Sequence, residues 1–360
     1  MSLETPLCNE HQRHGAQMGV WFGTLLPSDY GDFDAEYRRA SGSVALVDTN
    51  FQSVAEFTGS DRVRFLNAIT SGNIRDLKPG ESLLGLLLNP QGHILAELRT
   101  LALDDRLVVL SPAMVAGRTL ETLDKFIIMD DVTLLDRTAE FATFAAVGPA
   151  AGVFAEHLTQ VKSGDLPAGA HVEARVGETP IRVLRPTSLG LDGVEFLVPR
   201  AQLAGLWSRA LEIAEALSGG CAGYRAIESL RIEQGIAWFG ADFDDRVIPH
   251  EAGLETSHIS YVKGCYTGQE IVERVRSRGQ VNRRLAGLAF DSAALPQSGA
   301  RIFAEEKEVG WLTSAAFSPR KNCAIGLGYL RREFRQPGSR VHADGREAEI
   351  ISLPLESPPK

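Results

Sequence analysis

Residues 263–275 of the chain read KGCYTGQEIVERV, and this stretch says more about the protein than any other. Thr267 and Glu270 have the spacing of a capping box, which predicts a helix that begins just after Cys265. The thiol would then lie at the positive end of a helix dipole, two residues from the ammonium of Lys263. Both charges favour the thiolate form. The pattern therefore indicates a reactive or ligand-exchanging thiol, and the alternative is a small buried residue in a glycine-flanked turn.

The segment from 263 to 284 is basic, although the whole chain carries a formal net charge of −9. Its six basic residues and two acids are Lys263, Arg274, Arg276, Arg278, Arg283, Arg284, Glu270 and Glu273. A solvated helix face or an anion-binding rim, for a polycarboxylate or for RNA, would explain this local charge. The acidic balance of the chain argues against nucleic acid or an anionic membrane as the main partner of the whole surface.

The pattern of the sequence changes after Gly279. Short apolar runs alternate with turn residues, at 285–290, 309–314, 324–330, 339–342 and 349–353. Short strands at this spacing predict a small all-β barrel or sandwich. The sequence thus places a domain boundary near residue 280.

Upstream, two stretches repeat one order of elements. Residues 54–128 and 141–217 each read as strand, turn, helix, three strands and a helix. Two such blocks of about 75 residues predict a duplicated α+β unit. Each unit would pack its helices on one face of an antiparallel sheet.

Composition places the chain among soluble globular proteins. It has 360 residues, of which 44% are apolar and 23% charged, and this length suggests two or three domains. The densest apolar stretch, 83–88, is far shorter than the ~20 residues that a membrane-spanning helix needs. The first residues lack the pattern of a secretory signal. The four cysteines, Cys8, Cys221, Cys265 and Cys323, form no CxxC pair. We therefore expect free thiols and a cytoplasmic location.

Other site types find little support. An acidic cluster consists of Asp242, Asp244, Asp245, His250 and Glu251. It lacks a fixed ligand spacing, so we expect no metal there. The glycine-rich stretches include neither GxGxxG nor GxxxxGK[ST], and no GxSxG occurs. Nucleotide-binding loops and a serine hydrolase are not indicated.

The octapeptide KGCYTGQE resembles the signature of the YgfZ-type folate-binding proteins, which are relatives of the glycine-cleavage T-protein, an aminomethyltransferase. The resemblance extends from about residue 15 to 350. Its other segments are Val47–Asp48, FLNAITSGNIRDLKPGE (65–81), LLNPQG (87–92), SLGLDGVE (188–195), RAIESLRIEQGIAWFG (225–240) and VGWLTSAAFSPRKNCAIGLGY (309–329). The octapeptide is specific, whereas the other segments are shared across the superfamily.

The resemblance implies an α+β fold with three lobes around a central folate cavity. Residues 1–280 would form a T-protein-like folate-binding domain of two lobes, one of them at about 50–140. Residues 281–360 would form a C-terminal β-barrel domain. This arrangement agrees with the duplicated unit and with the change of pattern near residue 280.

The resemblance also implies ligand-binding residues. The glutamate and arginine that contact the pterin-bearing ligand in T-proteins fall on Glu195 and Arg225, and Asn89 and Glu97 lie in the matching hairpin region. A carboxylate can accept hydrogen bonds from pterin N–H groups, and a guanidinium can pair with a carboxylate or carbonyl. The alternatives are an exposed strand position for Glu195 and a surface salt bridge for Arg225.

One departure from the T-protein pattern bears on activity. The Asp-Asp pair of T-proteins, whose first member is credited with the transfer chemistry, falls on Ala96 and Glu97. An alanine cannot orient a folate nitrogen or stabilise charge. Glu97 is the next residue along a strand and should point to the opposite face. The departure argues against conventional aminomethyl transfer.

The resemblance implies a tetrahydrofolate-binding protein that assists iron–sulfur cluster assembly or repair in client enzymes, tRNA-modifying ones among them. Tetrahydrofolate or a one-carbon derivative would be the cofactor. Cys265 and Lys263 would carry the chemistry, and Gly264, Tyr266, Gly268, Gln269 and Glu270 would shape the turn. The expected partners are iron–sulfur client or assembly proteins, without a membrane or direct DNA binding.

Two other functions compete with this one. The first is a folate-dependent aminomethyl or one-carbon transferase that uses Glu97, Glu195 and Arg225. The second is an interaction module in which the cavity is vestigial and the basic segment docks a partner.

Overall fold

A computed structural model describes residues 2–162 and 166–356. The chain packs into two compact units, each described here by itself. The first holds residues 1–87, 96–227 and 258–267, and the second holds 88–95, 228–257 and 268–360. Residues 88–95 and 228–257 thus pack in the second unit although they precede residue 280. The expected sequence domains 1–280 and 281–360 stay a prediction.

The first unit opens with a small sheet and two short helices. Strands β1 (Leu3–Glu4), β3 (Thr24–Asp29) and β2 (Gln17–Trp21) form the sheet in that order. Along the chain, helix α1 (Cys8–Arg13) lies between β1 and β2, and α2 (Phe33–Gly42) follows β3. The Asp32 side chain caps α2 by accepting a hydrogen bond from the backbone N–H of Ala35.

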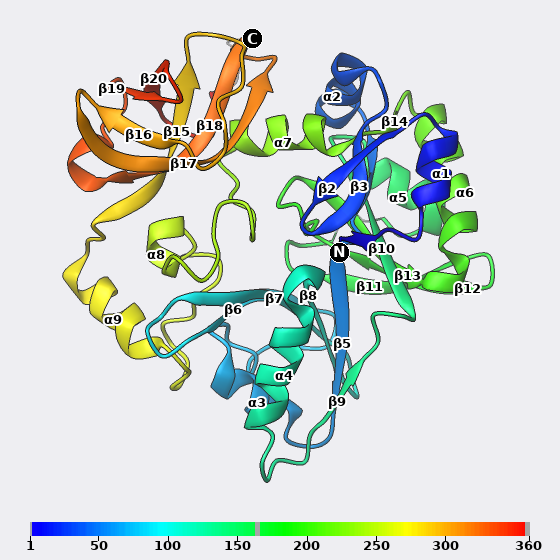
Figure 1. Ribbon diagram of the computed structural model, residues 1–360. Helices are drawn as coiled ribbons and strands as arrows, with labels where there is room; N and C mark the ends of the chain where they lie inside the picture. The colour runs from blue at the N-terminus through cyan, green and yellow to red at the C-terminus, as the bar shows by residue number, and fades with distance from the viewer. Residues whose placement is uncertain (1, 163–165, 357–360) are drawn as a thin grey trace. The chain divides into compact units, whose positions relative to one another are not determined.

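Two lobes with the same order of elements follow (Figure 1). The first lobe comprises β5 (Gln52–Thr58), α3 (Arg62–Ile69), β6 (Ser82–Leu88), β7 (Ile94–Ala102), β8 (Leu107–Pro112), α4 (Ala116–Phe126) and β9 (Thr133–Asp136). The second comprises β10 (Phe141–Val147), α5 (Ala151–Thr159), β11 (His171–Val176), β12 (Thr179–Leu184), β13 (Gly193–Pro199), α6 (Leu203–Ala216) and β14 (Gly220–Cys221).

The sheets of the two lobes also share one strand order. They run β6-β7-β8-β5-β9 and β11-β12-β13-β10-β4-β14, and the second contains β4 (Ala45–Asp48) as an extra strand. In both sheets the fourth strand of the lobe lies beside its first strand. The expected pair of α+β lobes is confirmed.

The alternation of side chains along β13 divides the second lobe into two layers. Val194, Phe196 and Val198 belong to a buried cluster that includes Trp207 of α6. Leu197, on the other face, belongs to a cluster with residues of the first lobe's sheet: Val54, Leu101, Val108 and Leu110. The two sheets therefore share an apolar layer, and strand alternation places Glu195 on the face of β13 that borders it.

The second unit contains a closed six-stranded barrel, as the sequence predicted. Its strands run in the order β15 (Arg283–Phe290), β18 (Cys323–Arg331), β17 (Lys307–Ser318), β16 (Arg301–Ala304), β19 (Arg340–Ala343) and β20 (Arg346–Ile351). The barrel is filled by apolar side chains such as Leu288, Leu312 and Ile350. A Cβ at Gly310 would lie 1.8 Å from the carbonyl oxygen of Tyr329, so this strand pairing requires glycine.

The remaining helices are short. Helix α8 (Pro249–Ala252) and α9 (Gln269–Arg278) belong to the second unit, and α7 (Tyr224–Glu233) runs from one unit into the other. Within the residues that the structure describes, no helix is both long and apolar enough to cross a membrane.

Candidate functional site

Glu195 lies at the centre of a buried polar cluster, and its exposed fraction is 0%. The side chain is not at an exposed strand position, so that alternative is wrong. Its Oε1 accepts hydrogen bonds from Gln52 Nε2 at 2.6 Å and Ser188 Oγ at 2.8 Å. Its Oε2 accepts from the Ser188 backbone N–H at 2.9 Å and from Arg99 Nη1 at 3.4 Å. The carboxylate is therefore held on both oxygens.

The buried arginine beside Glu195 was not anticipated from the sequence. Arg99 comes from β7 of the first lobe, so its ion pair with Glu195 joins the two sheets. Its Nη1 also donates to the Pro186 carbonyl at 2.7 Å, whereas Nη2 is buried and forms no hydrogen bond among the described residues. Burial lowers the pKa of Arg99, and the Glu195 charge raises it. The sequence feature that could have identified Arg99 is its charge within the largely apolar strand β7.

A chain of hydrogen bonds runs from this cluster to the N-terminal segment. Gln52 Nε2 lies 3.3 Å from Thr143 Oγ1, and the Thr143 backbone N–H donates to Asn50 Oδ1. Asn50 Nδ2 in turn donates to Asp48 Oδ1 at 2.7 Å. The same backbone stretch, 47–52, thus supports both Glu195 and the buried Asp48.

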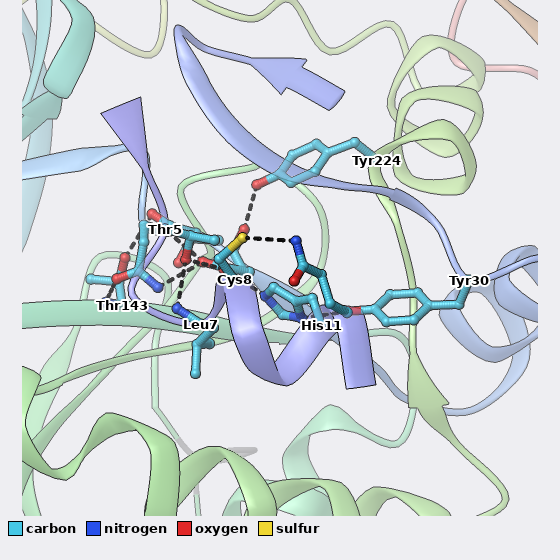
Figure 2. Close-up of polar contacts among 11 residues, drawn as sticks. Thr5, Leu7, Cys8, His11, Tyr30, Thr143 and Tyr224 are labelled. Atoms are coloured by element: carbon cyan, nitrogen blue, oxygen red, sulfur yellow. Dashed lines mark hydrogen bonds and ion pairs between the residues drawn. The ribbon is translucent and has the colours of Figure 1, made fainter. Parts of the chain in front are cut away.

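Asp48, at the end of β4, ties down helix α1 through His11. Figure 2 labels His11 together with Thr5, Tyr30 and Tyr224 of the same cluster. Asp48 Oδ2 accepts from Thr5 Oγ1 at 2.5 Å and lies 2.8 Å from His11 Nε2. His11 Nδ1 is 2.8 Å from the Tyr30 hydroxyl, and the Tyr224 hydroxyl donates to the Asp48 carbonyl. Asp48 and His11 are fully buried, so this cluster anchors the N-terminal segment.

Arg225 lies elsewhere on the first unit. Its side chain is 62% exposed, and its Nη1 is 2.9 Å from Asp29 Oδ2. The pair joins an exposed guanidinium to a buried carboxylate, and a contact of Arg225 with a ligand stays a prediction. The cation that contacts Glu195 is Arg99 instead.

The environments of Ala96 and Glu97 differ as strand alternation predicts. Ala96 is fully buried, whereas the Glu97 side chain is 26% exposed. Glu97 Oε1 lies 2.8 Å from His258 Nε2. A carboxylate–imidazole pair of this kind can hold and move a proton. His258 was not predicted from the sequence. The only indication was its position, five residues before Lys263.

Asn89 makes its hydrogen bonds within the turn between β6 and β7. Its Oδ1 accepts from the His93 backbone N–H at 2.9 Å, and its own N–H donates to the His93 carbonyl. Its backbone carbonyl lies 2.7 Å from where a Cβ at Gly268 would stand. The turn therefore approaches the start of α9 closely, and both belong to the second unit.

The predicted capping box at the start of α9 is wrong. The helix begins at Gln269, and its N-cap is Gly268 with φ of 82°, so Thr267 does not cap it. Only glycine fits the N-cap, because the conformation is left-handed and Asn89 leaves no room for a Cβ. Glu270 pairs with Arg274 at 2.6 Å on the exposed helix surface.

The Lys263 ammonium is buried and bound to the end of α3. Its Nζ donates to the carbonyl oxygens of Asn67, Thr70 and Gly72. Carbonyls at a helix C-terminus attract a cation. Burial first, and then the charge of Arg75, lower the pKa of Lys263 to about 8. The Tyr266 ring lies under the ammonium at 5.0 Å, so Lys263 fixes the course of residues 263–266.

Cys265 is exposed, so the alternative of a small buried residue is wrong. Its neighbours Lys263 and Tyr266 are buried, whereas Gly264 is exposed. The thiol is thus presented to solvent between two anchored side chains.

Three of the acidic residues considered as metal ligands form ion pairs with arginines instead. Asp242 binds Arg231 at 2.5 Å, Asp244 binds Arg246 at 2.7 Å, and Glu251 binds Arg283 at 2.8 Å. Among the described residues, no group of three His, Cys, Asp or Glu side chains is placed to hold a metal ion.

The structure has two α+β lobes with the same order of elements, a buried carboxylate between their sheets, and a closed barrel. These features define a class of two-lobed proteins with a C-terminal barrel. Comparison with family models assigns this class. Residues 7–258 match the GCVT N-terminal domain, and residues 283–355 match the glycine cleavage T-protein C-terminal barrel domain. The chain belongs to the glycine-cleavage T-protein family.

Named relatives cover nearly the whole chain. The mitochondrial aminomethyltransferase of Gallus gallus is 30% identical over 382 residues, covering 99% of this chain and 92% of that protein. The aminomethyltransferase of Thermosipho melanesiensis is 25% identical, covering 98% of this chain and 96% of that protein. The crystal structure of the glycine cleavage system aminomethyltransferase T from Bartonella henselae has a TM-score of 0.88 at 22% identity, covering 99% and 98% of the two chains. That likeness establishes a shared fold.

Proposed function

We propose that the chain binds tetrahydrofolate, or a one-carbon derivative, through the cluster around Glu195. The observation that carries this proposal is a fully buried carboxylate beside a guanidinium, Arg99, whose Nη2 has no hydrogen-bond partner among the described residues. A pterin presents N–H donors next to a carbonyl acceptor. A carboxylate accepts from the former, and a guanidinium donates to the latter. The residues fit such a ligand.

Ligand binding requires an exchange of partners on Glu195, because both of its oxygens already accept two hydrogen bonds. Gln52 and the Ser188 hydroxyl are neutral donors and are the easier ones to displace. The contact with Arg99 is charge-assisted and would be kept. Tetrahydrofolate supplies the nitrogen atoms that carry a one-carbon unit, and the chain supplies the buried anchor.

We further propose that the chain is of the YgfZ type and assists iron–sulfur cluster assembly or repair in client enzymes in the cytoplasm. The octapeptide 263–270, the exposed Cys265 and the absence of a carboxylate at Ala96 support this proposal. A solvent-exposed thiol can exchange with sulfur or iron held by a partner protein. Lys263 would act by fixing the loop that presents the thiol.

Replacing Cys265 with alanine tests this function, and Cys323→Ala is the matched control because Cys323 is another free thiol. In cells that lack the native protein, Cys265→Ala should lose all support of iron–sulfur enzyme activity. Cys323→Ala should support it fully. Both variants should bind tetrahydrofolate like the wild type in a calorimetric titration. Full activity of Cys265→Ala would remove the thiol from the function.

The alternative, a folate-dependent aminomethyl or one-carbon transferase, is favoured by one observation. Glu97 and His258 form a largely buried carboxylate–imidazole pair next to the position of the missing aspartate. Relatives at 25% and 30% identity are named aminomethyltransferases. Turnover of an aminomethyl donor with tetrahydrofolate, lost in Glu97→Gln and His258→Gln, would establish this alternative.

A further inference from the structure

A cavity lies at the far end of the apolar layer that the two sheets of the first unit share. Its volume is about 690 Å³, which is in the range of small-molecule sites in proteins. On β13, Leu197 lines the cavity two residues beyond Glu195 on the same face of the strand. On β5, Val54 and Glu56 line it, two and four residues beyond Gln52. The described residues that line the cavity do not include those that bind Glu195, so it is a separate site.

Part of the cavity wall is apolar and comes from both lobes. Val54 and Val108 of the first lobe and Leu197 of the second belong to one buried cluster, and all three line the cavity. Phe141 and Ile181 of the second lobe extend this surface. A ligand that enters the cavity could therefore bury a hydrocarbon or aromatic body against both sheets.

The charges in the cavity wall favour an anion. Three partly buried arginines line it, Arg106, Arg137 and Arg182. Among the described residues of the wall, Glu56 is the one buried acid. Four further acids of the wall are exposed, where solvent screens their charges more strongly. These acids are Asp104, Asp105, Glu140 and Glu173.

Two of the arginines already have carboxylate partners. Arg106 lies 3.0 Å from Glu56 and 2.6 Å from Asp105. Arg137 lies 2.7 Å from Glu140 and 3.7 Å from Glu56. Each of these guanidinium groups is therefore paired with two carboxylates.

Arg182 is less well neutralised. Its side chain is 18% exposed, and it contacts the carboxylate of Glu173 at 3.5 Å, whose side chain is 64% exposed. Its Nη1 lies 3.0 Å from His171 Nδ1, which must accept because a guanidinium only donates. Burial, followed by the charges of Arg182 and Arg99, lowers the pKa of His171 to about 4, so this neighbour is neutral.

A second cation acts on Arg182. Burial lowers the pKa of Arg182, the charge of Glu173 raises it, and the charge of Arg106 lowers it. Arg182 thus combines partial burial, one long contact with an exposed carboxylate and repulsion from another arginine of the same wall. An anion in the cavity would offset this repulsion.

We propose that the cavity binds a small carboxylate with an apolar body, such as an arylalkanoate. Its carboxylate would pair with Arg182, because a guanidinium matches a carboxylate in a bidentate manner. Its body would pack against Val54, Val108 and Leu197. The proposal is independent of folate binding at Glu195 and of the thiol of Cys265.

Calorimetric titration with phenylbutyrate tests the proposal. The wild type should bind one molecule per chain. Arg182→Gln should bind at least tenfold more weakly, because it loses a charge-assisted hydrogen bond to the probe. Glu173→Gln should bind about threefold more tightly, because Arg182 is then freed from its exposed carboxylate partner.

The matched controls make the same charge changes on the same hairpin, as Arg175→Gln and Glu178→Gln, at residues outside the cavity wall. Both controls should bind phenylbutyrate like the wild type. Glu173 is exposed, so Glu173→Gln should keep the thermal transition of the wild type and tests the cavity even where Arg182→Gln is less stable.

Two further titrations separate this site from the others. The uncharged phenylbutyramide should bind the wild type at least tenfold more weakly than the acid. Saturating tetrahydrofolate should leave the affinity for phenylbutyrate unchanged. No binding by the wild type at millimolar probe, equal affinity for acid and amide, unchanged affinity in both Arg182→Gln and Glu173→Gln, or displacement of the probe by tetrahydrofolate would each overturn the proposal.

Discussion

At the scale of single residues, the buried pair Arg99–Glu195 is the feature on which most depends. Breaking a buried ion pair by removing one partner costs about 3–5 kcal/mol, because the other charge is left uncompensated. Arg99→Met should therefore lower the free energy of unfolding by about that amount, as measured by urea denaturation. The double variant Arg99→Met, Glu195→Gln should recover much of the loss, because no buried charge remains. If the double variant is no more stable than Arg99→Met, the loss of unfolding free energy does not come from the unpaired charge of Glu195.

The same residues mark the limit of prediction from sequence. Glu195 could be singled out, because the segment 188–195 resembles a known block. Arg99 and Gln52 could not, because they reach Glu195 from the other lobe's sheet. A pairing between residues 96 positions apart depends on how the lobes pack, and no local pattern encodes it. Arg225, by contrast, could be placed on its helix, but its partner Asp29 could not.

At the scale of elements, the buried Lys263 that holds the loop 263–266 makes the stability of the protein depend on pH. Its pKa of about 8 lies below the ordinary value of 10.5, so the unfolded chain binds more protons between these values. The contribution of this group to stability therefore rises as the pH increases from about 8 to 10.5. Below about 8 it no longer changes, because both states are protonated. The difference in unfolding free energy between wild type and Lys263→Met should rise across this window. A flat difference would mean that Lys263 titrates normally.

The order of the elements was predictable, whereas the start of α9 was not. Strand and helix patterns gave the duplicated lobes and the barrel because hydrophobic periodicity is local. The spacing of Thr267 and Glu270 satisfied the rule for a capping box, yet Gly268 is the N-cap. The reason is tertiary: the carbonyl of Asn89, in a distant turn, approaches too closely for a side chain at this position. Packing of the turn therefore overrides the capping preference.

At the scale of the whole molecule, the first unit is organised around a shared layer between its two sheets. The ligand cluster takes Gln52 and Arg99 from one sheet, and Glu195 with its neighbour Ser188 from the other lobe. A ligand that engages Glu195 should therefore stabilise both lobes together, by about 2.7 kcal/mol at a hundredfold excess over its Kd.

Hydrogen exchange measured with and without tetrahydrofolate tests this coupling. The amides of β5, β7 and β13 should all exchange more slowly with ligand, because these strands carry Gln52, Arg99 and Glu195. Glu195→Gln keeps the size of the side chain but loses its charge, and it should weaken binding by about 1–3 kcal/mol and reduce the protection in all three strands. Protection confined to one lobe would mean that the ligand does not bridge the sheets. In that case Arg99 would hold the lobes together without contributing to binding.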